Sequence, residues 1–222
     1  MKATEVRGWP APEPERPILR GVLHLGAAVV APFALAALVL VADSPAAYAG
    51  AAIFAASVVL LYATSAAYHV APWPSRVRRV MMRIDHSMIF ILIAGTYTPF
   101  CLVTLDLSWG LPVLAAVWSL AAAGVLVKSM FPDAPRVLGV ALYLALGWSG
   151  VVAASQVITG LPARGLILLV AGGMLYSLGS VVYAMRRPDP FPRTFGYHEV
   201  FHALVVGGTA IHFTVIALYV VS

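Results

Sequence analysis

Seven long apolar stretches occupy almost the whole of this 222-residue chain and leave no room for a separate soluble domain. An α-helix needs about 20 apolar residues to cross the hydrocarbon core of a bilayer. Charged residues make up only 10% of the chain, against roughly 25% in a soluble domain, and the mean hydropathy is +0.92. The sequence therefore predicts an all-α integral membrane protein built as a seven-transmembrane-helix bundle. We expect its spans at residues 20–42, 46–70, 80–104, 109–129, 136–158, 163–185 and 197–221.

The chain divides into a short polar tail and a membrane domain. Residues 1–19 are rich in Pro, Glu and Arg, which favours a disordered tail over a cleavable signal peptide. Residues 20–222 are expected to form the seven-helix membrane domain. The single cysteine, Cys101, excludes an internal disulfide.

The basic residues lie almost entirely on one side of the predicted bundle. Thirteen of the 14 lysines and arginines precede the first span or flank the connections after the second, fourth and sixth spans, and only Arg164 lies opposite. The positive-inside rule therefore places the N-terminal tail in the cytoplasm and the C-terminus outside, in a multi-pass protein of the cell inner (plasma) membrane. The pI of about 9.6 reflects these loops, so we expect contacts with anionic membrane lipids and none with nucleic acid.

This topology excludes two other classes of seven-helix protein. A G-protein-coupled receptor has its N-terminus outside, the reverse of the orientation predicted for this chain. A retinal protein needs a lysine in its seventh helix for the Schiff base. The only lysines are Lys2 and Lys128, and neither lies in the seventh span.

The ionisable residues inside the spans are mostly histidines. Only two of the nine acids, Asp85 and Glu199, enter the apolar stretches, whereas every histidine lies within a span or at its edge. Imidazole and carboxylate groups are costly at membrane depth, so such residues indicate a functional site. The six histidines are His24, His69, His86, His198, His202 and His212.

Several of these polar residues are expected at one depth, near the cytoplasmic face. His198 and His202 are four residues apart, so they share a helix face about 6 Å apart and can hold one metal ion. His69 ends the second span, and Asp85 lies about one turn into the third from the same side. Ser65 lies one turn from His69 on the same helix face. Because three separate helices agree in depth, the pattern favours a site of three imidazoles with a carboxylate beside them.

Alternatives stay open for the remaining polar residues. His24 shares this depth, yet it, His86 and His212 are as readily explained as interhelical hydrogen-bonding residues. Asp85 could instead form a salt bridge with an arginine near the inner leaflet. Glu199 completes the HExxH pattern of soluble zinc proteases, but it also lies at a helix N-terminus, where a negative charge is stabilised.

Four motifs carry a family resemblance: SAAYH at residues 65–69, DH at 85–86, AGTYTPF at 94–100 and HEVFH at 198–202. In order and spacing they resemble the hemolysin III proteins, the bacterial branch of the progestin and adiponectin receptor family. The likeness covers roughly residues 20–220. The wider superfamily includes the alkaline ceramidases, which are lipid amidases.

The resemblance implies a zinc ion bound near the cytoplasmic face of the bundle. The family's zinc ligands correspond to His69, His198 and His202 in this chain. Asp85 would hold the water in the fourth coordination position, and Ser65 would lie beside it as a second site residue. Bacterial members are associated with membrane homeostasis, and the hemolysin name reflects a cytolytic effect.

These residues are compatible with three functions. The first is a zinc-dependent hydrolase of a lipid amide or ester, similar to a ceramidase. In that reaction Asp85 is the general base, and Ser65 hydrogen-bonds the oxyanion or orients Asp85. The second is a non-catalytic, receptor-like sensor of membrane homeostasis that zinc stabilises. The third is a pore-forming cytolysin, for which the spans offer little polar lining.

Overall fold

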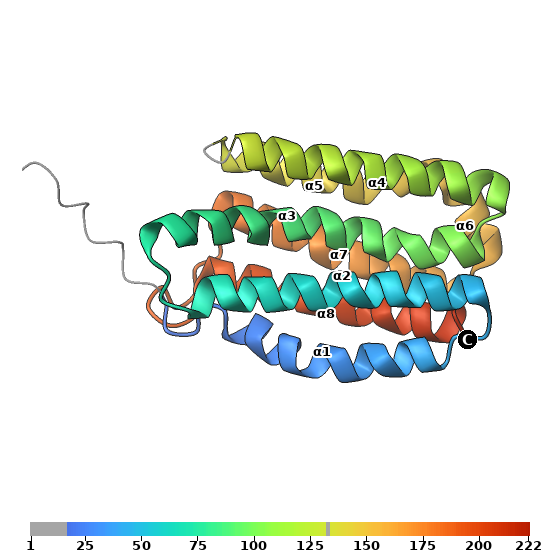
Figure 1. Ribbon diagram of the computed structural model, residues 1–222, viewed down its shortest axis with the longest axis horizontal. Helices are drawn as coiled ribbons and strands as arrows, with labels where there is room; N and C mark the ends of the chain where they lie inside the picture. The colour runs from blue at the N-terminus through green and yellow to red at the C-terminus, as the bar shows by residue number, and fades with distance from the viewer. Residues whose placement is uncertain (1–16, 132–133) are drawn as a thin grey trace, which may run out of the picture.

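The computed structural model describes residues 17–131 and 134–222, which form a bundle of long antiparallel helices (Figure 1). Among these described residues, seven helical segments are long and apolar enough to cross a membrane, so the predicted fold class is confirmed. Two of these segments include a short stretch that is not α-helical: the π-helix η1 at the end of the third span and the 3₁₀-helix η2 within the fifth. The elements are α1 (Val22–Leu40), α2 (Pro45–Val70), α3 (Ser75–Pro99), η1 (Phe100–Thr104), α4 (Leu107–Met130), α5 (Arg136–Trp148), η2 (Ser149–Ala153), α6 (Ala154–Gly160), α7 (Ala163–Met185) and α8 (Tyr197–Tyr219).

Helix boundaries follow local chemistry that the apolar pattern does not contain. The α2 helix begins at Pro45, where the fixed φ of proline suits a first turn, and the Ser44 hydroxyl accepts a hydrogen bond from Ala47 N at 3.2 Å. The third span begins at Ser75, five residues before the expected start at residue 80. Its first turns are rich in arginine, so their low hydropathy hid them from a prediction based on apolar length. The helix continues beyond the apolar stretch.

Seven spans place the start of α1 and the C-terminus at opposite ends of the bundle (Figure 1). We call the end at which α1 begins the basic end, because it holds Arg20, the arginines in the first turns of α3, Lys128 and Arg136 at the facing ends of α4 and α5, and the arginines that follow α7. The expected tail over residues 1–19 falls largely outside the described residues. Residues 17–20 form a turn that is fastened to the α7–α8 connection, where Ile18 N donates to Arg193 O and Leu19 N to Thr194 O.

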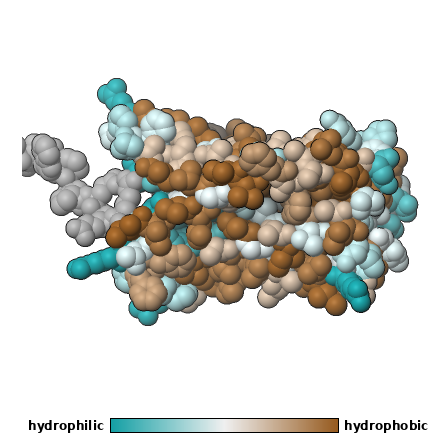
Figure 2. Space-filling model, turned by 90° about the horizontal axis from the view of Figure 1, so that it is seen from below, coloured by the Kyte–Doolittle hydropathy of each residue, from teal (hydrophilic) through white to brown (hydrophobic). Residues whose placement is uncertain are grey.

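The outer surface is apolar between two more polar ends. Figure 2 shows hydrophobic residues along the middle of one face and hydrophilic residues gathered toward both ends. Side chains such as Phe33 of α1 and Ile167 of α7 are exposed on the outside of the bundle. A lipid environment would cover such a surface, whereas water would not.

Small residues allow the helices to pack closely. A Cβ atom added at Gly50 of α2 would lie 2.7 Å from the backbone Cα of Pro99, at the junction of α3 and η1. By contrast, a Cβ added at Gly173 of α7 would meet no atom within 4 Å. Gly50 therefore sets the distance between two helices, as small residues do in membrane bundles.

We expect Gly50→Ala to destabilise the protein by about 1–3 kcal/mol, because the new methyl group overlaps backbone atoms that cannot rotate away. The matched control is Gly173→Ala, which should be neutral or slightly stabilising because alanine favours helix. Thermal unfolding of both variants in detergent tests this. Equal midpoints for the two variants would contradict the packing role of Gly50.

Candidate metal centre

Three histidines from two helices meet inside the basic end of the bundle. His69 lies in the last turn of α2, while His198 and His202 lie in the first two turns of α8. One ring nitrogen from each residue lies within 4.8 Å of the other two, and all three side chains are buried. The Nε2 atoms of His69 and His198 are 3.3 Å apart. The structure thus brings together the three residues expected to bind a metal.

The spacing suits a small metal ion. Zinc binds histidine nitrogens at roughly 2.0–2.1 Å in tetrahedral geometry, so two ligand nitrogens lie about 3.4 Å apart. The His69–His198 separation of 3.3 Å agrees with this value. In addition, the buried Nδ1 of His202 has no hydrogen-bond partner among the described residues. The donor set of three imidazoles therefore fits zinc.

Asp85 brings a carboxylate to the edge of this cluster from a third helix. Its Oδ2 lies 3.8 Å from His69 Nε2, and the side chain is buried within α3. This separation is too long for a direct hydrogen bond but allows a bridging water. Asp85 therefore lies where a carboxylate beside the histidines was expected.

Ser65 reaches the site through His24, which forms an interhelical hydrogen bond, one of the two interpretations that the sequence left open. The Ser65 hydroxyl lies 2.8 Å from His24 Nδ1, and the His24 ring stacks on the His202 ring at 3.7 Å with an interplanar angle of 8°. His24 of α1 is buried and lines the same cavity. Its depth in the sequence was the available signal, but depth alone does not say which way a side chain points.

Glu199 and Arg20 fix the start of α8. Glu199 Oε2 accepts a hydrogen bond from Gly196 N at 2.8 Å, and its Oε1 pairs with Arg20 Nε at 2.5 Å. Glu199 is only 1% exposed. Both carboxylate oxygens are thus engaged at the helix N-terminus, which argues against the protease-like assignment and agrees with a stabilising role.

The remaining two histidines lie apart from the triad. His212 lies deeper in α8, and its Nε2 is 3.1 Å from the carbonyl oxygen of Leu169 on α7, so it links two helices as expected. His86 lines the cavity from α3, next to Asp85. Its backbone carbonyl accepts a hydrogen bond from Tyr143 OH at 3.0 Å.

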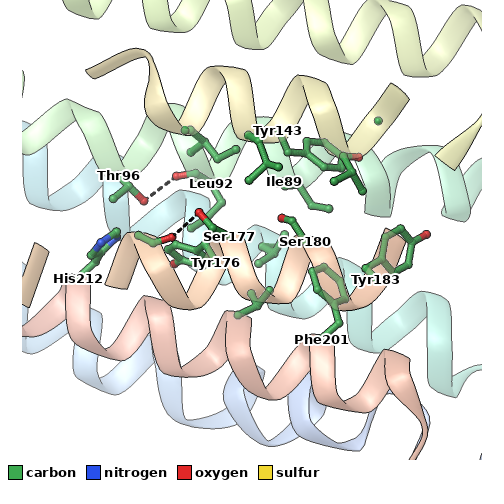
Figure 3. A pocket seen from close by; sticks show the side chains of 18 of the residues that line it. Ile89, Leu92, Thr96, Tyr143, Tyr176, Ser177, Ser180, Tyr183, Phe201 and His212 are labelled. Atoms are coloured by element: carbon green, nitrogen blue, oxygen red, sulfur yellow. Dashed lines mark hydrogen bonds between the residues drawn. The ribbon is translucent and has the colours of Figure 1, made fainter. Parts of the chain in front are cut away.

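A cavity of about 1110 Å³ extends from the histidines between the helices. It is larger than many ligand pockets, which measure roughly 300–1,000 Å³. Figure 3 shows aliphatic and aromatic side chains from several helices directed into it, together with the polar side chains of Thr96, Ser177, Ser180 and His212. The labelled lining residues include Ile89 and Leu92 of α3, Tyr143 of α5, Tyr176 and Tyr183 of α7, and Phe201 of α8.

Fold and site together define a class: a seven-helix membrane protein with a buried three-histidine cluster at one end of an internal cavity. The chain belongs to the haemolysin-III related family, whose pattern matches residues 13–213. It is 36% identical over 170 residues to the hemolysin-3 homolog of Bacillus subtilis, covering 77% of this chain and 76% of that protein. Hemolysin-3 of Bacillus cereus is 36% identical over 168 residues, covering 76% and 74% of the two chains.

More distant relatives extend the family beyond bacteria. The human monocyte to macrophage differentiation factor is 26% identical over 176 residues, covering 75% of this chain and 68% of that protein. The rice heptahelical transmembrane protein ADIPOR1 is 27% identical over 184 residues, covering 76% of this chain and 49% of its own length. These matches support the expected relationship to the progestin and adiponectin receptor family.

We expect Arg20→Met to destabilise the protein by about 3 kcal/mol, because it leaves the buried Glu199 carboxylate without its cation. The double variant Arg20→Met/Glu199→Gln should recover part of this loss, since glutamine keeps an acceptor for Gly196 N–H without a charge. Thermal unfolding in detergent measures both. A double variant less stable than Arg20→Met alone would rule out charge pairing as the cause.

Proposed function

We propose that this protein is a zinc-dependent hydrolase that cleaves an amide or ester bond of a membrane lipid. The observation that carries the proposal is the convergence of His69, His198 and His202 within 4.8 Å at a large apolar cavity, with the Asp85 carboxylate beside them. A three-histidine donor set leaves one coordination position open, which is typical of catalytic rather than structural zinc. When bound, zinc supplies a Lewis acid and lowers the pKa of its water to about 7.

Asp85 acts as the general base in this proposal. Its carboxylate is within one bridging water of His69, so it can accept a proton from a nucleophilic water and later return it to the leaving group. It lies on α3, whereas the metal ligands lie on α2 and α8, so the base and the ligands approach from different sides.

Ser65 and His24 act together as positioning groups. Their 2.8 Å hydrogen bond links α1 to α2, and the stacking of His24 on His202 supports the orientation of a proposed ligand ring. Interactions of this kind around the ligands fix ring orientation in metal sites. Ser65 thereby supports the site through His24, in addition to the hydroxyl role expected near Asp85.

The cavity binds the lipid itself. Its lining is mostly apolar and aromatic, which suits acyl chains, and it is continuous with the histidine cluster. By the positive-inside rule we assign the basic end, and with it the proposed zinc site, to the cytoplasmic face of the inner membrane. A lipid entering from the inner leaflet would then bring its headgroup linkage to the histidines.

A non-catalytic sensor is the second candidate. In that case zinc ties the end of α2 to the start of α8, where two helices distant in sequence already meet through His69 and His198. The same geometry then has a structural purpose, and membrane homeostasis depends on a conformational response rather than on turnover.

Zinc binding is tested by elemental analysis of the purified protein. We expect about one zinc per chain, and a loss of most of it in His202→Ala, because two imidazoles hold the ion much less tightly than three. His212→Ala is the matched control, since it removes a buried histidine of the same helix that lies outside the cluster. Equal metal content in the two variants would exclude the assigned ligands.

Turnover is tested by fatty-acid release from vesicles that contain amide-linked and ester-linked lipids. We expect Asp85→Asn to keep its zinc and lose activity by roughly 10²–10⁴-fold, the usual contribution of a general base. Glu199→Gln should retain activity, because Glu199 serves the helix N-terminus. A zinc-loaded wild-type protein that leaves every lipid intact would favour the sensor over the hydrolase.

A further inference from the structure

A buried lysine at the basic end lies outside the zinc machinery. Lys128 lies in the last turn of α4, and only 7% of its surface is exposed. Lysines at the ends of membrane helices usually extend their ammonium groups outward to the head groups and water. Lys128 instead lines the internal cavity.

The neighbouring helix accommodates the Lys128 ammonium group. A Cβ added at Gly139 of α5 would lie 3.4 Å from Lys128 Nζ, so the ammonium lies close to the α5 backbone at this glycine. Figure 1 shows α4 and α5 side by side along one edge of the bundle, and the two helices are in contact. The helix dipole stabilises a cation at this end of α4, but an outward-pointing lysine would gain the same stabilisation.

Among the described residues, no carboxylate pairs with this charge. Within residues 17–131 and 134–222, the ion pairs join Arg20 to Glu199 and His69 to Asp85, and Lys128 forms neither an ion pair nor a hydrogen bond. A buried cation without a partner is costly, so an anion supplied from outside the chain would stabilise it.

Arg136, one turn before Gly139 on α5, adds a second cation to the cavity lining. Its guanidinium donates a hydrogen bond to Tyr183 O at 3.1 Å and packs over the rings of Tyr183 at 4.7 Å and Tyr197 at 5.7 Å. These contacts hold the group in place without neutralising it. His86, next to Asp85 on α3, also lines the cavity.

We propose that Lys128 and Arg136 bind the phosphate group of an anionic lipid whose acyl chains occupy the cavity. Phosphate offers several charged oxygens, so it can pair with an ammonium and a guanidinium at once. The apolar remainder of the cavity favours phosphate that is attached to acyl chains over the free ion. This binding does not depend on the proposed hydrolase function. If the protein is a hydrolase, the bound anionic lipid is its substrate, and that assignment rests on the proposed function.

The test measures binding rather than turnover and uses full-length Asp85→Asn protein in detergent. The probe is a fluorescent short-chain phosphatidic acid, with a fluorescent diacylglycerol of the same chain length as the phosphate-free control. Lys128→Met keeps the side-chain volume and removes the charge, and Lys128→Gln is a second variant in case the first folds poorly. Arg79→Met is the matched control, because it removes a cation from an exposed position of α3 at the basic end of the bundle.

We expect Lys128→Met to weaken phosphatidic acid binding by roughly 10-fold to 100-fold, as loss of a charge-assisted hydrogen bond does. Diacylglycerol binding should change less than twofold, and Arg79→Met should leave both unchanged. Unchanged phosphatidic acid affinity in both Lys128 variants would overturn the proposal. Equal competition by inorganic phosphate and by unlabelled phosphatidic acid would overturn its lipid part. Because the assay needs no turnover, a failed hydrolase assay leaves its result intact.

Discussion

The cost of placing polar groups inside an apolar bundle governs this structure. Lipid offers no hydrogen bonds, so every imidazole and carboxylate at this depth must find its partner within the protein or in a bound ion. The structure meets this requirement by clustering: three histidines face one another, a carboxylate lies at their edge, and the Glu199–Arg20 pair lies at the start of α8. Isolated polar side chains would be far less favourable.

This clustering also determines how the helices are arranged around the site. α1, α2, α3 and α8 each contribute a polar side chain to the cluster, through His24, His69, Asp85 and His202. α5 and α7 contribute mostly apolar and aromatic groups to the cavity beyond it. One set of helices therefore holds the clustered polar groups, while the other lines the more apolar part of the cavity. Lys128 of α4 belongs to neither set.

Much of this arrangement could be predicted from the sequence, because apolar length and charge asymmetry report depth. The seven spans follow from hydropathy, and the i, i+4 spacing of His198 and His202 brings both onto one face. Helix rotation about its own axis does not follow from depth. The depth of His24 could therefore be predicted, but its stacking on His202 could not. For the same reason, the sequence does not distinguish a Lys128 that points into the bundle from one that points outward.

The central claim is that His69, His198 and His202 are the protein ligands of one zinc ion. X-ray absorption at the zinc edge, measured on the purified full-length protein, tests this claim most directly. The account predicts three nitrogen neighbours at roughly 2.0–2.1 Å and one oxygen neighbour, with no sulfur. A shell of oxygen atoms alone, or a protein that carries no zinc after purification in zinc-containing buffer, would contradict it.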